Sequence, residues 1–260
     1  EDKTQWELDT SLPREGRQFV NSFGVSDAVI DELSIKTSQA ESIQFPVFMY
    51  DHLVDIRKYN PGQRPKVTSR IGCPAGLIVP FDVWRNTPKT KVTLLCAGEK
   101  DMAVARSHGF NAITLTGGEQ THPIVLKEFE NRKVIIVYDN DDAGHTGAQK
   151  IACTLYGIAA QVKICTNFHN VCTEKGEDIT DYFMKYHKTR QDLITCMEAT
   201  EVFEPQPGTF DQFYPIMDLL TASRSENVGK LVRSNIQVVA TNEASYIMPT
   251  TIIAEKFKLS

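Results

Sequence analysis

The sequence predicts an α/β protein in which a parallel, Rossmann-like sheet with helices on both faces follows a small basic α+β subdomain. Short apolar runs alternate with helical stretches between residues 91 and 204, which indicates βαβ units with right-handed crossovers. Basic residues are concentrated between residues 57 and 91, and acidic residues follow three of the predicted strands. With 41% hydrophobic and 23% charged residues, the composition is typical of a soluble globular protein. It excludes a disordered chain, a collagen-like chain and a disulfide scaffold.

Residues 1–90 are predicted to form the basic N-terminal α+β subdomain. Apolar residues recur every three to four positions between residues 19 and 33, which indicates helix, and Ser26 is a suitable N-cap. Two β-forming stretches follow: residues 43–59, which end in a turn at Asn60–Gly62, and the piece GLIVPFDVW at residues 76–84.

Residues 91–204 are predicted to form the parallel sheet and its helices. The predicted strands are Val92–Cys96, Asn111–Leu115, Val134–Tyr138 and Gln161–Cys165. Helical segments are predicted at Glu99–His108, from the turn at Gly117 and Gly118 to about Glu130, within Asp139–Tyr156, at Ile179–His187 and at Gln191–Ala199. Ligands of such sheets bind at the carboxyl ends of the strands, so we expect the functional site there.

Residues 205–260 are predicted to be a C-terminal helical and hairpin segment, the start of a further module. A PQPG stretch after Glu204 breaks the alternating pattern. A helical piece at 210–222 is followed by two β-like runs around Asn242 and Glu243, which indicate a hairpin.

The six cysteines are scattered without a CxxC pair, which is typical of the reduced thiols of a cytoplasmic protein. Cys165, His169 and Cys172 lie near one another in the sequence, but their spacing fits no common four-ligand zinc site, so we expect no zinc. No apolar run approaches the ~18 residues of a membrane span, and the N-terminal residues show no signal peptide. We therefore expect a cytoplasmic protein with no membrane partner.

The basic residues form a local surplus. Eight lie between Arg57 and Lys91, against the single acid Asp82, in a chain whose formal net charge is −5. Such a surplus beside an acidic body suggests a strip that binds phosphates next to a metal-binding region. The alternative is a solvated face without a ligand. Because the chain has no global basic field, a nucleic acid would have to bind locally.

The segment Tyr138–Gly144 reads YDNDDAG and follows the most β-branched strand of the chain. If the strand geometry continues through Asp141, the carboxylates of Asp139 and Asp141 point the same way and repel unless a cation lies between them. Mg²⁺ suits such oxygen ligands. The alternative is an Asx turn that also caps the following helix.

Two further acidic clusters also follow predicted strands. One is Cys96–Asp101, with the sequence CAGEKD, and the other is Gly176–Asp181, with the sequence GEDITD. Three acidic clusters at three strand ends are much less expected by accident than one. Together they favour a metal site.

These motifs resemble the TOPRIM domain of bacterial and phage primases. The pattern is a strand followed by GxxD, which Gly98 and Asp101 match, then DxDxAG at 139–144, then Asp178 ahead of a helix. Upstream, the features around Phe45, Arg57–Tyr59 and Leu77–Trp84 are similar to the N-terminal part of a primase RNA-polymerase domain. The resemblance covers about residues 20–200, and the TOPRIM motifs are its more specific part.

The resemblance implies template-directed synthesis of short RNA primers by two-metal nucleotidyl transfer, with two Mg²⁺ (or Mn²⁺) ions. The positions implied as catalytic are Ala97, Glu99, Asp101, Asp139 and Asp141. The implied metal ligands are Asp139, Asp141 and Asp178. The residues expected to hold template or triphosphate phosphates are Arg57, Lys58, Arg64, Lys66 and Arg70. Tyr59 and Trp84 are candidates for base stacking, against the alternative that both are core residues.

The chain departs from the family at position 97, where the family has glutamate before the glycine and this sequence has Ala97. We interpret this as an engineered, inactivating substitution of that glutamate. The alternative is a natural, degenerate or accessory TOPRIM domain. Glu99, two residues on, supplies partial negative charge in this interpretation without restoring full activity.

The implied partners are single-stranded DNA, ribonucleoside triphosphates and a replicative helicase in cis or in trans, in phage or mobile-element replication. Two other function classes remain: a non-catalytic TOPRIM module that binds nucleic acid, and a TOPRIM nuclease. The basic run before the TOPRIM motifs favours the polymerase over the nuclease.

Overall fold

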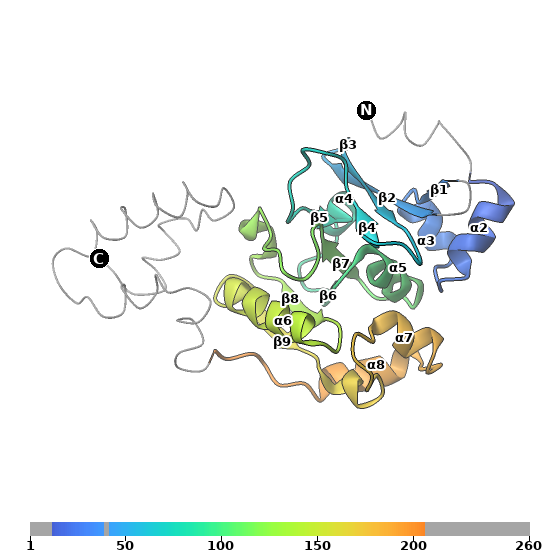
Figure 1. The fold of residues 1–260 in the computed structure, drawn as a ribbon. Coiled ribbons are helices and arrows are strands. Elements are labelled where there is room, and N and C mark those ends of the chain that lie inside the picture. The colour runs from blue at the N-terminus through green and yellow to red at the C-terminus, as the bar shows by residue number, and fades with distance from the viewer. Residues whose placement is uncertain (1–11, 39–41, 206–260) are drawn as a thin grey trace.

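The computed structural model describes residues 12–38 and 42–205 (Figure 1). Two sheets and the helices that cover them make up this part of the chain. In it, no helix combines the length and the apolar character needed to cross a membrane.

An antiparallel sheet and two helices form the N-terminal layer. The helices are α2 (Arg14–Asn21) and α3 (Asp27–Glu32), and the strands, in the order β1-β2-β3-β4, are β1 (Lys36–Ser38), β2 (Ser42–Met49), β3 (His52–Tyr59) and β4 (Val67–Thr68). The predicted cap of α3 is confirmed, because the Ser26 side chain accepts a hydrogen bond from the backbone N–H of Val29.

The β-rich stretch predicted at 43–59 is two strands joined by a tight turn. Tyr50 and Asp51 both have positive φ, of 52° and 63°, and their backbone N–H groups donate to the carboxylate of Asp82 at 2.9 and 3.1 Å. The partner that holds this turn lies about thirty residues away in the sequence, so local composition gave no sign of it.

The second sheet has the order β5-β7-β6-β8-β9 and is mostly parallel. Its strands are β5 (Ile78–Val79), β6 (Thr93–Cys96), β7 (Ala112–Leu115), β8 (Lys133–Val137) and β9 (Gln161–Ile164). Only the edge strand β5 is antiparallel to its neighbour, β7. The predicted class, an α/β protein with a parallel sheet, is confirmed.

Helices cover both faces of this sheet. The helical segments that follow β5 are α4 (Phe81–Arg85), α5 (Glu99–Ser107), η1 (Leu126–Phe129), α6 (Asp142–Leu155), η2 (Asn167–Asn170), α7 (Ile179–Met184) and α8 (Arg190–Glu198). Alternate strand residues enter different cores: Leu94 packs with α5 and α7, and Leu95 packs with α4 and α6. This is the period-two alternation of a strand buried on both faces.

Two local predictions were wrong. Phe81–Trp84, expected within a β-like piece, is helical in α4 and follows Pro80, which has an extended backbone. The helix expected between Gly118 and Glu130 is reduced to the short 3₁₀ turn η1. Gly117, Gly118 and Pro123 lie in this segment, and these residue types disfavour a helix interior.

The core that includes α5 and α7 extends into the N-terminal layer. Val20, Ile30 and Phe45 belong to the same buried cluster as Leu94 and Met102. β5 also pairs with β7 across the boundary expected between residues 90 and 91. The predicted domain limits stay predictions, and the elements predicted at 210–222 and around Asn242 lie outside the described residues.

Candidate metal centre and basic face

Three aspartates meet at the carboxyl edge of the parallel strands. Asp101, Asp139 and Asp178 each offer a carboxylate oxygen, and these oxygens lie within 4.8 Å of one another. Asp101 lies in the first turn of α5, after β6; Asp139 follows β8; and Asp178 is the N-cap of α7. The sheet therefore brings together residues that are far apart in the sequence.

Hydrogen bonds from α7 orient two of these carboxylates. The side chain of Asp178 accepts from the backbone N–H of Asp181, and the Asp181 carboxylate accepts from the backbone N–H of Asp178 in return, which forms a capping box. The Thr180 hydroxyl donates to Oδ1 of Asp101 at 2.6 Å. Both side chains are thereby oriented before any ligand binds.

Lys100 supplies a positive charge to the cluster. Its Nζ donates to Oδ2 of Asp178 at 2.8 Å and lies 3.3 Å from Oδ1 of Asp101. Burial opposes the charge on Lys100, but the two carboxylates outweigh burial and raise its pKa. One ammonium group partly neutralises three carboxylates, so the cluster keeps an excess of negative charge.

The pKa values reflect this excess. Burial, followed by repulsion from Asp178, raises the pKa of Asp101 to about 7. Burial, followed by repulsion from Asp101 and Asp178, raises the pKa of Asp139 to about 9. Oδ1 of Asp139 is buried and has no hydrogen-bond partner within residues 12–38 and 42–205. An all-oxygen set with an unpartnered carboxylate oxygen fits a hard divalent cation such as Mg²⁺ or Mn²⁺.

Asp141 takes the helix-capping geometry. β8 ends at Val137, so the strand alternation does not reach Asp141. Its Oδ1 instead accepts from the backbone N–H of Gly144 at 2.8 Å and caps α6. The close cluster is completed by Asp101 rather than by Asp141, whose predicted role as a metal ligand stays a prediction.

Ala97 and Glu99 lie close to the cluster in sequence but face other surroundings. Ala97 is buried and packs with Leu95 and Tyr138. Glu99 is 3% exposed, and its Oε1 accepts from Nε of Arg57 at 2.6 Å. The Glu99 carboxylate is therefore paired with an arginine of β3, outside the aspartate cluster.

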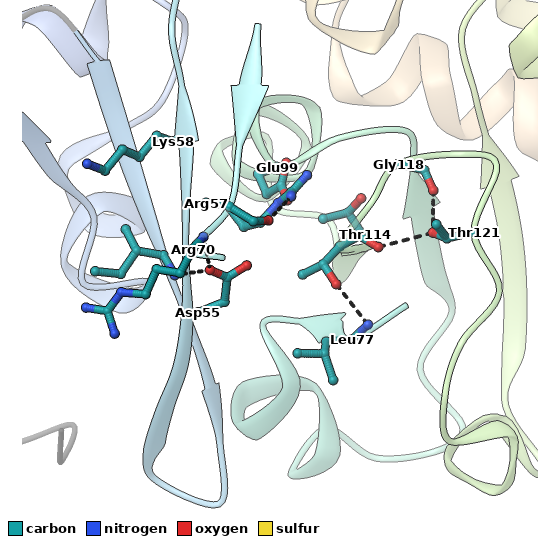
Figure 2. A network of polar contacts seen from close by, with 12 residues as sticks. Asp55, Arg57, Lys58, Arg70, Leu77, Glu99, Thr114, Gly118 and Thr121 are labelled. Atoms are coloured by element: carbon teal, nitrogen blue, oxygen red, sulfur yellow. Dashed lines mark hydrogen bonds and ion pairs between the residues drawn. The ribbon is translucent and has the colours of Figure 1, made fainter. Parts of the chain in front are cut away.

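The five basic residues expected to bind phosphates divide into two groups. Arg57 is buried, paired with Glu99 and hydrogen-bonded to Ser69. The other four are exposed. Lys58 lies on β3, Arg64 and Lys66 lie between β3 and β4, and Arg70 follows β4. Figure 2 shows Arg57 turned towards Glu99, whereas the side chains of Lys58 and Arg70 extend away from it.

The two aromatic candidates also differ. Trp84 is fully buried, and its Nε1 donates to the Thr93 hydroxyl at 3.3 Å, so it is a core residue. Tyr59 is partly buried and packs edge-on against Phe23, with ring centroids 5.8 Å apart. Its ring lies 6.0 Å from Nζ of Lys100, which places it beside the aspartate cluster.

Sequence reasoning missed two charged residues of the site. One is Lys100, to which the motif CAGEKD alone assigns no function. The other is Glu119, in the turn after β7, where burial and repulsion from Asp141 and Asp101 raise its pKa to about 7. Glu119, like the aspartates, is an acid that shortly follows a strand. The sequence signal was therefore present, but Glu119 falls within the segment that is predicted to be a helix.

A pocket of about 440 Å³ adjoins the segment after β8. Its lining includes Asn140, Gly144, His145 and His169, and the rings of the two histidines lie 5.3 Å apart. Nε2 of His169 lies 3.0 Å from the backbone carbonyl of Tyr138, which fixes this imidazole at one wall. The pocket is lined by sequence neighbours of Asp139 but by none of the three clustered aspartates.

Comparison with known proteins agrees with this architecture. Residues 94–183 match a family model described as Toprim-like. The primase of Aquifex aeolicus, solved with its zinc-binding and RNA-polymerase domains, is similar in structure, with a TM-score of 0.54 at 15% identity over 95% of this chain and 68% of that chain. No curated protein matches the sequence.

Two structures from bacteriophage T7 are also similar. A chain from the complex of its lagging-strand DNA polymerase with primase domains, an RNA/DNA hybrid and dTTP has a TM-score of 0.51 at 11% identity, over 70% of this chain and 91% of that chain. The primase fragment of its primase-helicase protein has a TM-score of 0.50 at 13% identity, over 68% and 71%. At these identities the likeness shows a fold shared with these structures and no more.

Proposed function

We propose, from the Toprim-like match of residues 94–183 and the primase-like fold around it, that this chain is the RNA-polymerase core of a DNA primase. It would join ribonucleoside triphosphates into short primers on single-stranded DNA. The observation that carries the proposal is the cluster of Asp101, Asp139 and Asp178 at the carboxyl edge of the sheet.

The aspartate cluster would hold Mg²⁺ or Mn²⁺, two ions in the complete reaction. Bound divalent ions stabilise the charge on a transferring phosphoryl group and activate the attacking hydroxyl. Lys100 orients Asp178, and Thr180 orients Asp101. In the proposed reaction these contacts hold the ligand oxygens in place, so less rearrangement is needed when the nucleotide enters.

The exposed basic residues would bind the template. Lys58, Arg64 and Lys66 lie on β3 and the segment leading to β4, in the layer that packs beside α5. Contacts from lysine and arginine to phosphates position a strand without reading its sequence. Tyr59, whose ring lies 6.0 Å from Nζ of Lys100, would contact a base or a sugar.

We further propose that the protein works in the cytoplasm, in the replication of a phage or another mobile element, with a replicative helicase as partner. The T7 neighbour named above comes from a primase-helicase protein, which supports this arrangement. A helicase pull-down with the natural full-length protein tests it.

Primer synthesis on single-stranded DNA tests the main proposal. Labelled ribonucleotides and Mn²⁺ or Mg²⁺ are supplied to the chain, to Ala97→Glu and to the double variant Ala97→Glu with Asp139→Asn. We expect short oligonucleotides with Ala97→Glu, at least ten-fold less with the unchanged chain, and none with the double variant.

The other function classes give different results in the same assay. DNA binding without products from any variant would overturn the primase proposal and favour a non-catalytic module. Metal-dependent shortening of labelled DNA would favour a nuclease. Circular dichroism of Ala97→Glu controls for misfolding, because position 97 is buried.

A further inference from the structure

Glu119 is held by a turn at the same edge of the sheet as the aspartate cluster. Gly117 and Gly118 have positive φ, of 90° and 79°, which glycine adopts without strain. The Thr121 hydroxyl donates to the backbone carbonyl of Gly118 at 2.6 Å, and its backbone N–H donates to the same carbonyl at 3.1 Å (Figure 2). Residue 119 therefore lies in a turn with a defined shape.

Two glycines of α6 make room for this turn. A Cβ atom at Gly147 would lie 2.4 Å from the backbone carbonyl oxygen of Glu119, and one at Gly144 would lie 2.9 Å from its Oε2. Gly144 and Gly147 are three residues apart and so share a face of the helix. Nε2 of Gln120 donates to the carbonyl of Ala143 at 2.7 Å, which fastens the turn to the first turn of α6.

One oxygen of the Glu119 carboxylate has no partner among the described residues. Its Oε2 is buried and makes no hydrogen bond in the described part of the chain, as is also true of Oδ1 of Asp139. Oε2 of Glu119 lies near Asp139, because a Cβ atom at Gly144 would lie 2.9 Å from Oε2 of Glu119 and 2.2 Å from the backbone carbonyl oxygen of Asp139. Burying an unpaired polar group is costly, and two of the same charge require a cation or a proton nearby.

Asp141 also contacts Gly144, the glycine next to which Oε2 of Glu119 lies. Its Oδ1 contacts the Gly144 backbone N–H, and Oε2 of Glu119 lies against the position of the missing Gly144 side chain. Repulsion from Asp141 is the largest electrostatic contribution to the raised pKa of Glu119. The carboxylates of Asp141 and Glu119 thus both lie at the first turn of α6, close to Gly144.

We propose that Glu119 is a further ligand of the divalent-cation centre and supplies its carboxylate from the turn after β7. This rests on the proposed metal-dependent function. The cation would be bound by oxygen atoms of Glu119 and Asp139, next to the site formed by the three aspartates.

Binding of Mn²⁺ alone to the purified chain tests this proposal without any activity assay. Electron paramagnetic resonance counts bound Mn²⁺, and isothermal titration gives the affinity. The variants are Glu119→Gln, Asp139→Asn and, as a matched control, Glu130→Gln, which alters an exposed glutamate in the loop before β8. We expect Glu119→Gln to lose one bound Mn²⁺ or to weaken binding at least ten-fold, while Glu130→Gln behaves as the unchanged chain does.

Thermal unfolding separates a ligand from a merely structural residue. Without metal, Glu119→Gln should unfold at the same temperature or a higher one, because repulsion has been removed, and its gain on adding Mn²⁺ should shrink. Unchanged Mn²⁺ stoichiometry and affinity in Glu119→Gln, with binding lost in Asp139→Asn, would overturn this inference alone. Failure of the unchanged chain to bind Mn²⁺ would overturn the metal-dependent function as well.

Discussion

Asp139 illustrates a conflict between burial and charge at a single residue. Its side chain lies among Asp101, Asp178 and Glu119, and only Lys100 lowers its pKa among the main contributions. The folded state therefore favours the protonated form, whereas the unfolded chain ionises near pH 4. A site shaped in this way is stabilised by the cation that its proposed function requires.

This conflict predicts how stability depends on pH. Above pH 4 the folded state holds more protons than the unfolded state, because burial raises the pKa of Asp139 to about 9 and that of Asp101 to about 7. Stability without metal should therefore fall as the pH rises through this window. We expect the unfolding temperature to drop by roughly 5 °C between pH 6.5 and 9.

Calorimetry with a chelator checks the pH prediction. Asp139→Asn should show a flatter profile, and excess Mn²⁺ should give its largest gain in unfolding temperature at the high-pH end. A profile that rises with pH in the chelated protein, or an identical slope in Asp139→Asn, would contradict it.

The sequence located acids at strand ends but not the direction of each side chain. Asp101, Asp139 and Asp178 were all named, because the carboxyl ends of parallel strands meet at one edge. The Asp141 side chain caps α6, and the Glu99 side chain pairs with Arg57. Both contacts depend on neighbours that only the folded chain provides. Glu119 was missed because its segment was assigned to a helix that the glycines do not allow.

At the scale of elements, α8 depends on its first turn. Thr189 accepts from the backbone N–H of Asp192, and the Asp192 carboxylate accepts from the backbone N–H of Thr189, which completes a capping box. Thr189→Ala should lower the free energy of unfolding by about 1 kcal/mol, the usual cost of losing such a cap. Urea denaturation measures this, and Thr195→Ala, in the exposed helix interior, serves as control. Equal midpoints for both variants would contradict the role of the cap.

The segment around β3 and β4 carries the prediction for DNA binding. Replacing Lys58, Arg64 and Lys66 by glutamine should weaken binding of single-stranded DNA and reduce the steepness of its salt dependence. Each phosphate contact on a single strand contributes about 0.7 to the slope of log K against log salt, so the loss should be about 2. Fluorescence anisotropy over a salt series measures the slope.

A control for this variant lies at the opposite edge of the sheet. Lys127 and Lys133 are exposed, and Lys133 begins β8, whereas the aspartate cluster lies beyond its other end. Their replacement by glutamine should leave the slope unchanged. A similar loss with both sets would indicate that only net charge matters.

The strands with continuous hydrophobic runs were predicted well, whereas elements whose conformation depends on tertiary contacts were not. The apolar runs of β6, β7, β8 and β9 were placed within one or two residues. The hairpin expected after Phe45 and Pro46 is present as β2 and β3, but the contact that holds its turn, from Asp82 of α4, has no local sequence signal. The reading of α4 as β-like has a related cause, since Phe81 and Trp84 are large and apolar and also fit a strand.

At the scale of the whole molecule, a buried ion pair joins the antiparallel sheet to helix α5. Nε of Arg57, on β3, donates to Glu99, at the start of α5, and their side chains are only 10% and 4% exposed. Glu99→Gln would leave the arginine charge buried without its counter-charge and should cost about 3 kcal/mol. Urea denaturation checks this.

Removing both charges gives the companion measurement. In Arg57→Met combined with Glu99→Leu no charge is left unpaired, so this variant should be clearly more stable than Glu99→Gln alone. If the free energy of unfolding of Glu99→Gln lies within about 0.5 kcal/mol of that of the unchanged chain, the ion pair between β3 and α5 does not contribute to stability.

The apolar core shared by the two layers has a consequence for how the chain can be divided. The Toprim-like match begins at residue 94, but Leu94 is packed with Ile30 and Phe45, from the layer before it. A fragment cut at that boundary would leave the inner side of α5 facing water and invite self-association. The segment matched by the family model is thus smaller than the unit that packs around one core, and the proposed template surface and the proposed metal site both belong to that larger unit.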